Sequence, residues 1–443
     1  MTNIRLAFLS LLLAVTPTLS WAAFTDEDLA RRATDFANAV VAENYDAARA
    51  MSTSTMQEAL KGDAFPQLRT SLVAKMGAIK SAGQAWASDT VSGYRRFRVP
   101  VSFESGMFDF QIVFDADGLV AGMGVQPYSP QPAKEDPATA AWRELELNVG
   151  PEGRALPGTL TLPKTGGPFP GVVLVHGSGP NDRDESSLGN KPFRDIARGL
   201  AARGIASLRY DKRTFARPKD FAEVGAKLTV KEESIDDAAA AIKVLSRRTE
   251  IDPKRVFVLG HSLGGQLAPR IAKAAKVAGM IVMAGSALPM PEKMIEQADY
   301  LARVDGTVSA EEQKNLDMLE QAVAALRVAM KQPDASSKLY LGAPSGYFKD
   351  LEAHNAPAET AALGLPVLVL QGKRDYQVTM ADFAEWQKAL TGKKGACLRS
   401  YDGLDHLMRK GEGPSSPEDY AKVRPVDPQV IGDIASFIAK GGC

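Results

Sequence analysis

The sequence predicts a doubly wound α/β domain with a mostly parallel sheet, preceded by a small α+β domain. Three observations support this prediction. From residue 171 onward, short continuous apolar runs alternate with helical stretches, which is typical of parallel strands covered on both faces. Before residue 127, helical stretches come first and strands of alternating pattern follow, which indicates a separate α+β unit. Between the two, residues 127–139 contain four prolines and are typical of a linker.

Composition and charge describe an ordinary globular protein without an excess of basic residues. The 443 residues are 45% hydrophobic and 24% charged, which is enough apolar material for large cores and excludes wholesale disorder or a fibrous architecture. Lys and Arg together number 53, as do Asp and Glu, so the formal net charge is zero. Because no basic excess is available to neutralise phosphates, nucleic acid is not expected as a partner.

The N-terminus has the features of a secretory signal peptide. Arg5 precedes an apolar run over residues 6–15, and residues 20–22 form a small-x-small cleavage site, so we expect cleavage before Ala23 and a signal peptide over residues 1–22. A membrane anchor is disfavoured because the run is shorter than the ~20 residues of a spanning helix. The mature protein is therefore expected to be exported, either periplasmic or secreted, without a stable membrane anchor.

The small domain, residues 23–126, is assigned from its periodicity. Thr25 begins a capping-box pattern, and a helix with one apolar face follows through about Glu43. A second helical stretch covers roughly residues 64–80. The period then changes to two, which predicts an antiparallel meander of three strands at 94–103, 107–114 and 119–126.

The second domain, residues 140–443, carries the predicted parallel sheet. Its strands are expected at 142–149, 156–162, 171–175, 205–209, 256–259, 280–283, 367–370 and 396–401. The interval between Ala284 and Pro366 is too long for one crossover and contains an amphipathic helix near residues 311–331. We interpret residues 287–362 as an inserted helical lid.

The sequence leaves open whether its two cysteines, Cys397 and Cys443, form a disulfide. Cys397 begins the last predicted strand and Cys443 follows the last helical stretch. In an oxidising compartment their pairing would fasten the C-terminus to the sheet and contribute ~3–4 kcal/mol in the chain-entropy model. One buried thiol and one frayed terminal thiol are the alternative, and the sequence does not choose between them.

The strongest functional motif is the pentapeptide Gly-His-Ser-Leu-Gly at residues 260–264. It directly follows the predicted strand 256–259 and precedes a helix-like run over residues 266–275. In this strand–turn–helix context a sharp turn lifts the serine hydroxyl above the sheet, and the glycines leave room where a Cβ would collide with the backbone. We therefore predict Ser262 as a catalytic nucleophile rather than part of an ordinary glycine-rich turn.

A serine hydroxyl is a weak nucleophile and needs a base that is oriented by an acid. Among the four histidines, His406 lies in a loop directly after the strand 396–401, which suits a general base. His261 lies inside the serine turn, where its side chain should point away and contribute either to packing or to supporting the residues that react. His354 lies in the inserted region and is expected to be structural or exposed.

The acid is expected at a strand end between the serine and His406. The apolar run 365–370 leads into a short polar turn that ends at Asp375, whose carboxylate would orient the imidazole and stabilise the imidazolium. Asp405 competes for this role, but adjacent side chains on an extended segment usually diverge. We therefore predict a triad of Ser262, Asp375 and His406.

The loop after strand 171–175 is the candidate oxyanion hole. It begins at His176 with the sequence HGSGPNDRD, and a glycine turn at the C-terminal end of a strand can aim backbone N–H groups at a developing oxyanion. We assign the N–H of Leu263 and a second N–H from Ser178 or, as the less favoured choice, from Gly179. A dinucleotide-binding loop is the rival interpretation, but no G-x-G-x-x-G occurs here.

Two charged segments remain without a role at this stage. The Asp-Arg-Asp sequence at residues 182–184 fits either an ion-pair cluster that shapes the entrance to the site or a solvated loop. The Asp-Lys-Arg sequence at residues 211–213, after another predicted strand, is equally open.

Five ordered motifs resemble those of exported bacterial serine esterases of the α/β-hydrolase superfamily. They lie within residues 140–440 and read LVHGSGPNDRD, LRYDKR, LGHSLGG, LQGKRDYQV and LDHLM. In that family the turn serine, the strand-end aspartate and the loop histidine form the triad, in the chain order found here. Residues 23–126 are similar to a small nuclear-transport-factor-like α+β domain that often precedes such hydrolases.

The residues and the resemblance together imply a carboxylic ester hydrolase with an acyl-serine intermediate, acting on a small-molecule ester without metal or cofactor. Short acyl esters are expected because the lid region lacks the long apolar surface of interfacially activated lipases. Two other activities use the same triad order, a peptidase of the prolyl-oligopeptidase type and a thioesterase. A non-catalytic exported protein that binds a ligand or partner is the alternative from a different class.

Overall fold

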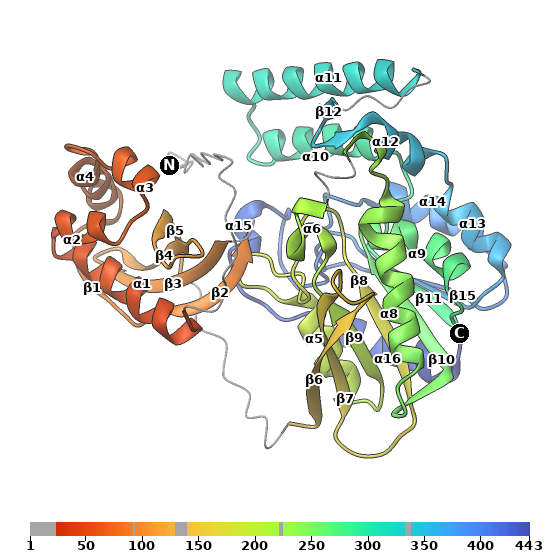
Figure 1. The fold of residues 1–443 in the computed structure, drawn as a ribbon. Helices are drawn as coiled ribbons and strands as arrows, with labels where there is room; N and C mark the ends of the chain where they lie inside the picture. Colours follow the sequence, from red (N-terminus) through yellow and green to blue (C-terminus); the bar gives the residue numbers. More distant parts are fainter. Residues whose placement is uncertain (1–23, 92–93, 129–139, 221–224, 333–337) are drawn as a thin grey trace. The chain divides into compact units, whose positions relative to one another are not determined.

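The computed structural model describes residues 24–91, 94–128, 140–220, 225–332 and 338–443 (Figure 1). The chain divides into two compact units, Met1–Tyr128 and Ser129–Cys443. The predicted signal peptide and most of the predicted linker lie outside the described residues. Among the helices of the described part, none combines the length and the apolar character needed to cross a membrane.

The first unit places four helices against a five-stranded antiparallel sheet with the order β1-β3-β4-β5, in which β2 pairs with β3. The helices and strands are α1 (Asp26–Val41), α2 (Tyr45–Ala50), α3 (Ser54–Ala59), α4 (Ala64–Met76), β1 (Ile79–Ala82), β2 (Trp86–Val91), β3 (Tyr94–Phe103), β4 (Gly106–Phe114) and β5 (Val120–Pro127). Thr25 forms the expected capping box at the start of α1. The core is aromatic and includes the fully buried Phe36, Phe97 and Phe110.

Five elements of this unit differ from the sequence prediction. The short helices α2 and α3 and the strands β1 and β2 were not expected, and α4 ends at Met76 rather than near residue 80. Gly77 ends this helix because its φ of +79° is in the left-handed region, and residues 79–82 then form β1. These short elements were not predicted because they have neither a continuous apolar run nor enough residues to show a period.

The second unit is built on an eight-stranded sheet with the order β15-β14-β11-β10-β8-β9-β7-β6. Its strands are β6 (Trp142–Val149), β7 (Leu156–Pro163), β8 (Phe169–Val175), β9 (Ala206–Tyr210), β10 (Ile251–His261), β11 (Gly279–Met283), β14 (Val367–Gly372) and β15 (Ala396–Tyr401). The pairs of β7 with β6 and β9 are antiparallel, and all other neighbours are parallel. All eight strands of the predicted sheet are present, and the predicted fold class is confirmed.

Helices cover both faces of this sheet (Figure 1). One face packs against α8 (Asp236–Ser246), α9 (Leu263–Ala274) and α14 (Met380–Leu390), and the other against α5 (Pro192–Ala201) and α16 (Pro428–Lys440). Consecutive residues of β8 face opposite sides of the sheet: Val173 packs on the side covered by α8, α9 and α14, and Val172 on the side covered by α5 and α16. Burial on both faces explains why these strands are continuously apolar.

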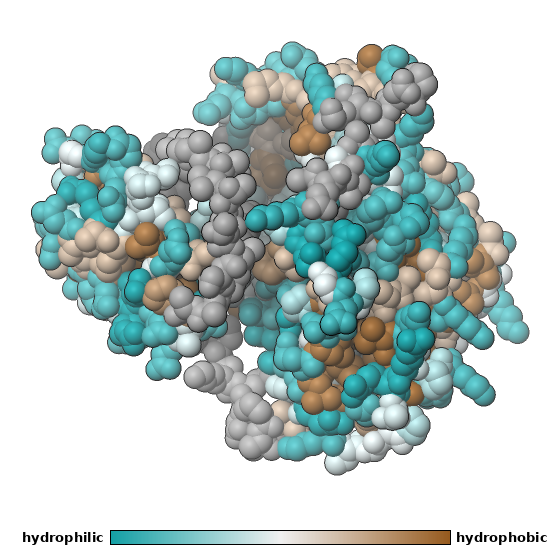
Figure 2. All heavy atoms as spheres, viewed as in Figure 1, coloured by the Kyte–Doolittle hydropathy of each residue, from teal (hydrophilic) through white to brown (hydrophobic). Residues whose placement is uncertain are grey.

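The chain between β11 and β14 forms the helical lid. It comprises α10 (Met290–Arg303), α11 (Ala310–Met330), β12 (Leu339–Tyr340), β13 (Ala343–Pro344), α12 (Ser345–Glu352) and α13 (Ala356–Leu363). A capping box at Ser309 begins α11, close to the predicted helix. Figure 2 shows hydrophilic and hydrophobic residues intermixed along the visible surface of α11, and Met318 and Val328 are exposed.

The C-terminus is fastened to the sheet by a disulfide between Cys397 and Cys443, whose Cα atoms lie 5.8 Å apart. Cys397 is the second residue of β15, and Cys443 follows α16. The structure therefore pairs the two cysteines, one of the two arrangements that the sequence left open.

Candidate active site

Ser262 occupies a strained turn between β10 and α9. Its φ of +53° lies in the left-handed region that residues with a side chain rarely adopt, and such strain is concentrated at functional sites. A Cβ on Gly260 would lie 2.0 Å from the carbonyl oxygen of Gly264, and a Cβ on Gly264 would lie 2.3 Å from that of Val175. The two glycines are therefore required by close backbone approach, as the motif predicts.

The Ser262 side chain lies beside the loop after β8 and lines a cavity. A Cβ on Gly177 would lie 3.0 Å from the Cβ of Ser262 and 3.5 Å from its hydroxyl oxygen. The cavity has a volume of about 630 Å³, and its wall includes residues of the lid helices α10 and α12 and of the β12–β13 hairpin. The serine is thus placed where a small molecule can reach it.

His406 and Asp375 are brought together at the carboxyl ends of β15 and β14. The imidazole Nδ1 lies 2.7 Å from Oδ2 of Asp375, and both side chains are buried. Oδ1 of Asp375 accepts the backbone N–H groups of Gln377 and Val378 at 2.8 and 2.9 Å. Since Nδ1 faces a carboxylate, we assign its proton there, which leaves Nε2 as the basic nitrogen.

Asp405, the competing acid, is engaged elsewhere. Its carboxylate forms an ion pair with Arg409 at 2.7 Å and accepts the backbone N–H groups of Leu407 and Arg409. These contacts fix the turn that carries His406, whereas the contact with Nδ1 belongs to Asp375.

The serine turn and the His406 loop are joined through His261 rather than by a direct bond. Nε2 of His261 lies 2.9 Å from the carbonyl oxygen of His406, and the two rings are 4.6 Å apart. Among the described residues, no hydrogen bond links the Ser262 hydroxyl to His406. Catalytic hydrogen bonds are often long before substrate binds, so the absence of this bond is compatible with His406 as the predicted base.

Glu185 is a site residue that the sequence interpretation missed. Its Oε2 lies 2.8 Å from Nδ1 of His261, and its Oε1 accepts the N–H of Gly177 at 2.6 Å. Burial alone would lower the pKa of His261, but the Glu185 carboxylate outweighs this effect and the pKa is raised. Both nitrogens of His261 thus face oxygens that only accept, which favours the imidazolium form. The sequence offered little indication of this role, since Glu185 is only one of several acidic residues in the loop that follows β8.

The predicted oxyanion-hole residues meet at one wall of the cavity. Ser178, Gly179 and Leu263 line it together with Ser262. Leu263 is the first residue of α9, so its N–H has no partner within the helix. In the described part of the chain, the N–H groups of these three residues donate no hydrogen bond, whereas the N–H of Gly177 is bound to Glu185.

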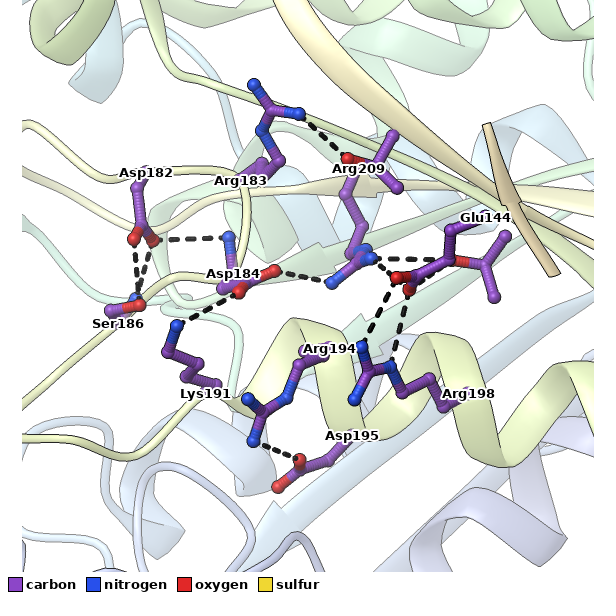
Figure 3. Close-up of polar contacts among 12 residues, drawn as sticks. Glu144, Asp182, Arg183, Asp184, Ser186, Lys191, Arg194, Asp195, Arg198 and Arg209 are labelled. Atoms are coloured by element: carbon purple, nitrogen blue, oxygen red, sulfur yellow. Dashed lines mark hydrogen bonds and ion pairs between the residues drawn. The ribbon is translucent and has the colours of Figure 1, made fainter. Parts of the chain in front are cut away.

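The Asp-Arg-Asp segment forms an ion-pair cluster rather than a solvated loop (Figure 3). Arg209 of β9, nearly fully buried, contacts Asp184 and lies 2.6 Å from Glu144 of β6. Arg183 pairs with Asp211 at 3.0 Å. The cluster fastens the loop that follows β8 to the antiparallel side of the sheet, and so fixes the path of the oxyanion loop.

His354 lies outside this constellation. It is in the turn after α12, with Nδ1 2.6 Å from Glu359, and it does not line the cavity that holds Ser262. Within the residues that the structure describes, no group of three or more His, Cys, Asp or Glu side chains is arranged to bind a metal ion.

Comparison with known families identifies the class of protein. The model of the alpha/beta hydrolase family matches residues 172–423, more than half of the chain, and the chain therefore belongs to this family. A model described as a protein of unknown function (DUF3887) matches residues 33–123 in the first unit.

One curated relative extends over both units. Esterase EstD of Thermotoga maritima is 36% identical over 437 residues, which cover 98% of this chain and 99% of the relative. Among solved structures, Est1E from Butyrivibrio proteoclasticus is 15% identical, with a TM-score of 0.42, and covers 67% of this chain and 98% of its own. The hyperthermophilic esterase from Pyrobaculum calidifontis is 16% identical, with a TM-score of 0.41, over 67% of this chain and 85% of its own.

Proposed function

We propose that the protein is a carboxylic ester hydrolase that acts through an acyl-serine intermediate. Ser262 is the nucleophile, His406 the general base and Asp375 the acid that orients it. The observation that carries the proposal is the buried hydrogen bond between His406 and Asp375, at the carboxyl ends of strands in the same sheet whose strand β10 leads into the strained turn at Ser262. The name of the relative EstD, an esterase, supports the substrate class.

The proposed reaction has two halves. Nε2 of His406 removes the Ser262 proton as the serine oxygen attacks the ester carbonyl, and the Asp375 carboxylate stabilises the imidazolium. The N–H groups of Leu263 and Ser178 or Gly179 stabilise the tetrahedral oxyanion. The imidazolium then protonates the departing alcohol. In the second half the same base activates a water molecule, which releases the acid and restores the serine.

Short acyl esters are the proposed substrates. The support for this part of the proposal is the cavity beside Ser262, which is bounded by lid residues and has a volume of about 630 Å³. Hydrolysis of p-nitrophenyl acetate, butyrate, octanoate and palmitate measures the preference. We expect the specificity constant to decrease beyond the butyrate. A constant that rises up to the palmitate would contradict the short-acyl proposal.

Export is a further part of the proposal, and it rests on the sequence of residues 1–22 alone. N-terminal sequencing of the protein recovered from a periplasmic extract tests it. We expect the mature chain to start at Ala23, whereas an intact Met1 in the cytoplasmic fraction would contradict export.

The catalytic assignment is tested with Ser262→Ala. Removal of the nucleophile should lower kcat for p-nitrophenyl acetate by several orders of magnitude, on the scale of about 10⁴-fold or more. An organophosphonate probe should label the wild type and not the variant. A variant that loses only a few-fold would overturn the assignment, and an unlabelled wild type would favour a non-catalytic binding protein.

Two other activities share the same triad order and are distinguished by substrate. Aminoacyl-amide and thioester substrates, compared with esters of the same acyl group, separate a peptidase of the prolyl-oligopeptidase type and a thioesterase from an esterase. We expect the ester to have the highest specificity constant.

A further inference from the structure

Three buried polar side chains connect the lid to the oxyanion loop, and the proposed mechanism does not use them. Lys212 follows β9, is 2% exposed, and donates from Nζ to the carbonyl oxygen of Gly177 at 2.7 Å. The same ammonium lies 2.8 Å from Oε1 of Glu233, which is 6% exposed. The Oε2 atom of Glu233 accepts the hydroxyl of Tyr347, from the lid helix α12, at 2.5 Å.

The buried charges of Lys212 and Glu233 are unfavourable for stability unless they serve another purpose. Removing an ammonium and a carboxylate from water costs free energy that a simple ion pair often fails to recover. Glu233 also lies in a π-helical segment, Lys231–Ile235, a local irregularity that is frequent at functional sites. The backbone N–H of Lys212 donates to the carbonyl oxygen of Asn181 at 3.0 Å, so the lysine is attached to the oxyanion loop twice.

The contact on Gly177 determines the direction of the next N–H. In a planar trans peptide, the carbonyl of Gly177 and the N–H of Ser178 belong to one unit and point in opposite directions. With the oxygen held by Lys212, and by the side-chain amide of Asn181 at 3.3 Å, the N–H of Ser178 cannot rotate freely. This peptide lies beside the nucleophile, since a Cβ on Gly177 would be 3.0 Å from the Cβ of Ser262.

We propose that Lys212 is a positioning residue that aims and polarises the Ser178 N–H toward the oxyanion, and that Glu233 and Tyr347 connect this function to the lid. A cation on the carbonyl oxygen draws electron density through the peptide and makes its N–H a stronger donor. The inference rests on the proposed function, because it requires an oxyanion. It also gives a role to residue 212, which the sequence analysis left open.

The central test is Lys212→Met, assayed with p-nitrophenyl acetate. We expect kcat to fall by about 10- to 100-fold, less than or similar to the loss of one oxyanion donor, while KM changes by less than about threefold. The burst of p-nitrophenol released by diethyl p-nitrophenyl phosphate counts the competent serines, so that kcat is expressed per active site. A misfolded fraction then cannot imitate the effect.

A second variant separates positioning from stability. Lys212→Met leaves the Glu233 carboxylate buried without its cation, whereas the double variant Lys212→Met/Glu233→Gln removes both charges. We expect the double variant to recover stability but not kcat. If kcat per titrated site of the double variant is within twofold of the wild type, Lys212 acts only through stability and the proposal is overturned.

A thionoester substrate provides a direct measure of how strongly the oxyanion hole donates hydrogen bonds. Sulfur accepts hydrogen bonds more weakly than oxygen, so the rate ratio of p-nitrophenyl acetate to its thiono analogue reports the strength of the oxyanion donors. We expect this ratio to fall in the Lys212 variants. The matched control is Arg270→Met, which removes an ion pair between α9 and the lid helix α12, with Asp350 at 2.9 Å, without touching the oxyanion loop. The rate ratio of this control should equal that of the wild type. If it falls as far as the ratio of the Lys212 variants, the proposal is overturned.

The connection to the lid is tested by Tyr347→Phe, which removes only the hydroxyl that binds Glu233. We expect the rate ratio to fall in the same direction by a smaller factor, and an unchanged ratio would overturn this part. The failure of the proposed function itself is recognised separately, because it would appear as an absent burst in the wild type or as activity retained by Ser262→Ala.

Discussion

The tight turn at Ser262 makes a prediction about Gly260. A methyl group at residue 260 would lie 2.0 Å from the carbonyl oxygen of Gly264 and 2.6 Å from the nitrogen of Gly265, so the backbone would have to shift. We expect Gly260→Ala to lower the free energy of unfolding by about 3 kcal/mol or more, measured by urea denaturation.

The matched control for this substitution is Gly432→Ala in α16. No atom lies within 4 Å of the added Cβ at residue 432, and alanine favours a helix. We expect no loss of stability there, and a gain of up to about 1 kcal/mol. Equal losses in the two variants would show that the close approach at residue 260 is not what requires glycine.

His176 makes stability depend on pH. Burial, with a smaller effect from Lys212, lowers its pKa from 6.5 to about 4, although Glu185 acts in the opposite direction. The unfolded chain therefore binds a proton at a higher pH than the folded protein, and the contribution to stability is fully present above pH 6.5 and is lost as pH falls toward 4. A shift of this size corresponds to about 3 kcal/mol.

His176→Gln isolates this effect. The stability of the wild type relative to the variant should fall by about 2–3 kcal/mol between pH 7.5 and pH 4.5 in urea denaturation. The comparison is needed because burial and Asp184 raise the pKa of the neighbouring Asp182 to about 6, which gives the opposite slope in both proteins. Parallel pH profiles of the two proteins would contradict the prediction.

The residues predicted for the triad could be found from the sequence because each has a local signal. Ser262 lies in a short motif, and Asp375 and His406 each follow an apolar strand at a polar turn. Glu185 and Lys212 have no such signal. Their roles arise from contacts with residues far along the chain, Glu185 with His261 and Lys212 with Gly177, which only the folded sheet brings together.

At the level of elements, strand burial determined what could be predicted. The parallel strands were identified because burial on both faces requires continuous apolar residues, as in β8 and β14. The strand β2, with the sequence WASDTV, carries polar residues in its middle and has no comparable pattern. The lid could be located from the length of the interval, but its small hairpin, β12–β13, has only two residues in each strand.

The disulfide that attaches the end of the last helix, α16, to the sheet leads to a prediction about stability. The bond between Cys397 and Cys443 spans 46 residues, and in the chain-entropy model it contributes about 3–4 kcal/mol. We expect Cys443→Ser to lower the free energy of unfolding by about this amount. In dithiothreitol the wild type should fall to the value of the variant, while the variant stays unchanged. A wild type that is insensitive to reductant would contradict a stabilising disulfide.

For the whole molecule, the two units have separate hydrophobic cores. Every residue of the proposed triad and of the surrounding cavity belongs to the unit Ser129–Cys443. We therefore expect a variant that lacks residues 23–139 to keep the specificity constant for p-nitrophenyl acetate within about threefold. A folded variant, judged by circular dichroism, with a loss of orders of magnitude would assign the first unit a part in the reaction.

The site of the lid insertion has a consequence for engineering. The lid leaves the sheet after β11 and returns at β14, and these strands pair directly from Met280 with Val367 to Met283 with Leu370. The pairing of β11 with β14, and not the intervening polypeptide, therefore sets the distance between Asp375, which follows β14, and Ser262, which follows the neighbouring strand β10. Lids of other lengths and compositions are therefore interchangeable in principle, provided that they keep the Tyr347 hydroxyl on Glu233, so a designer can graft new selectivity onto this enzyme without rebuilding its reactive centre.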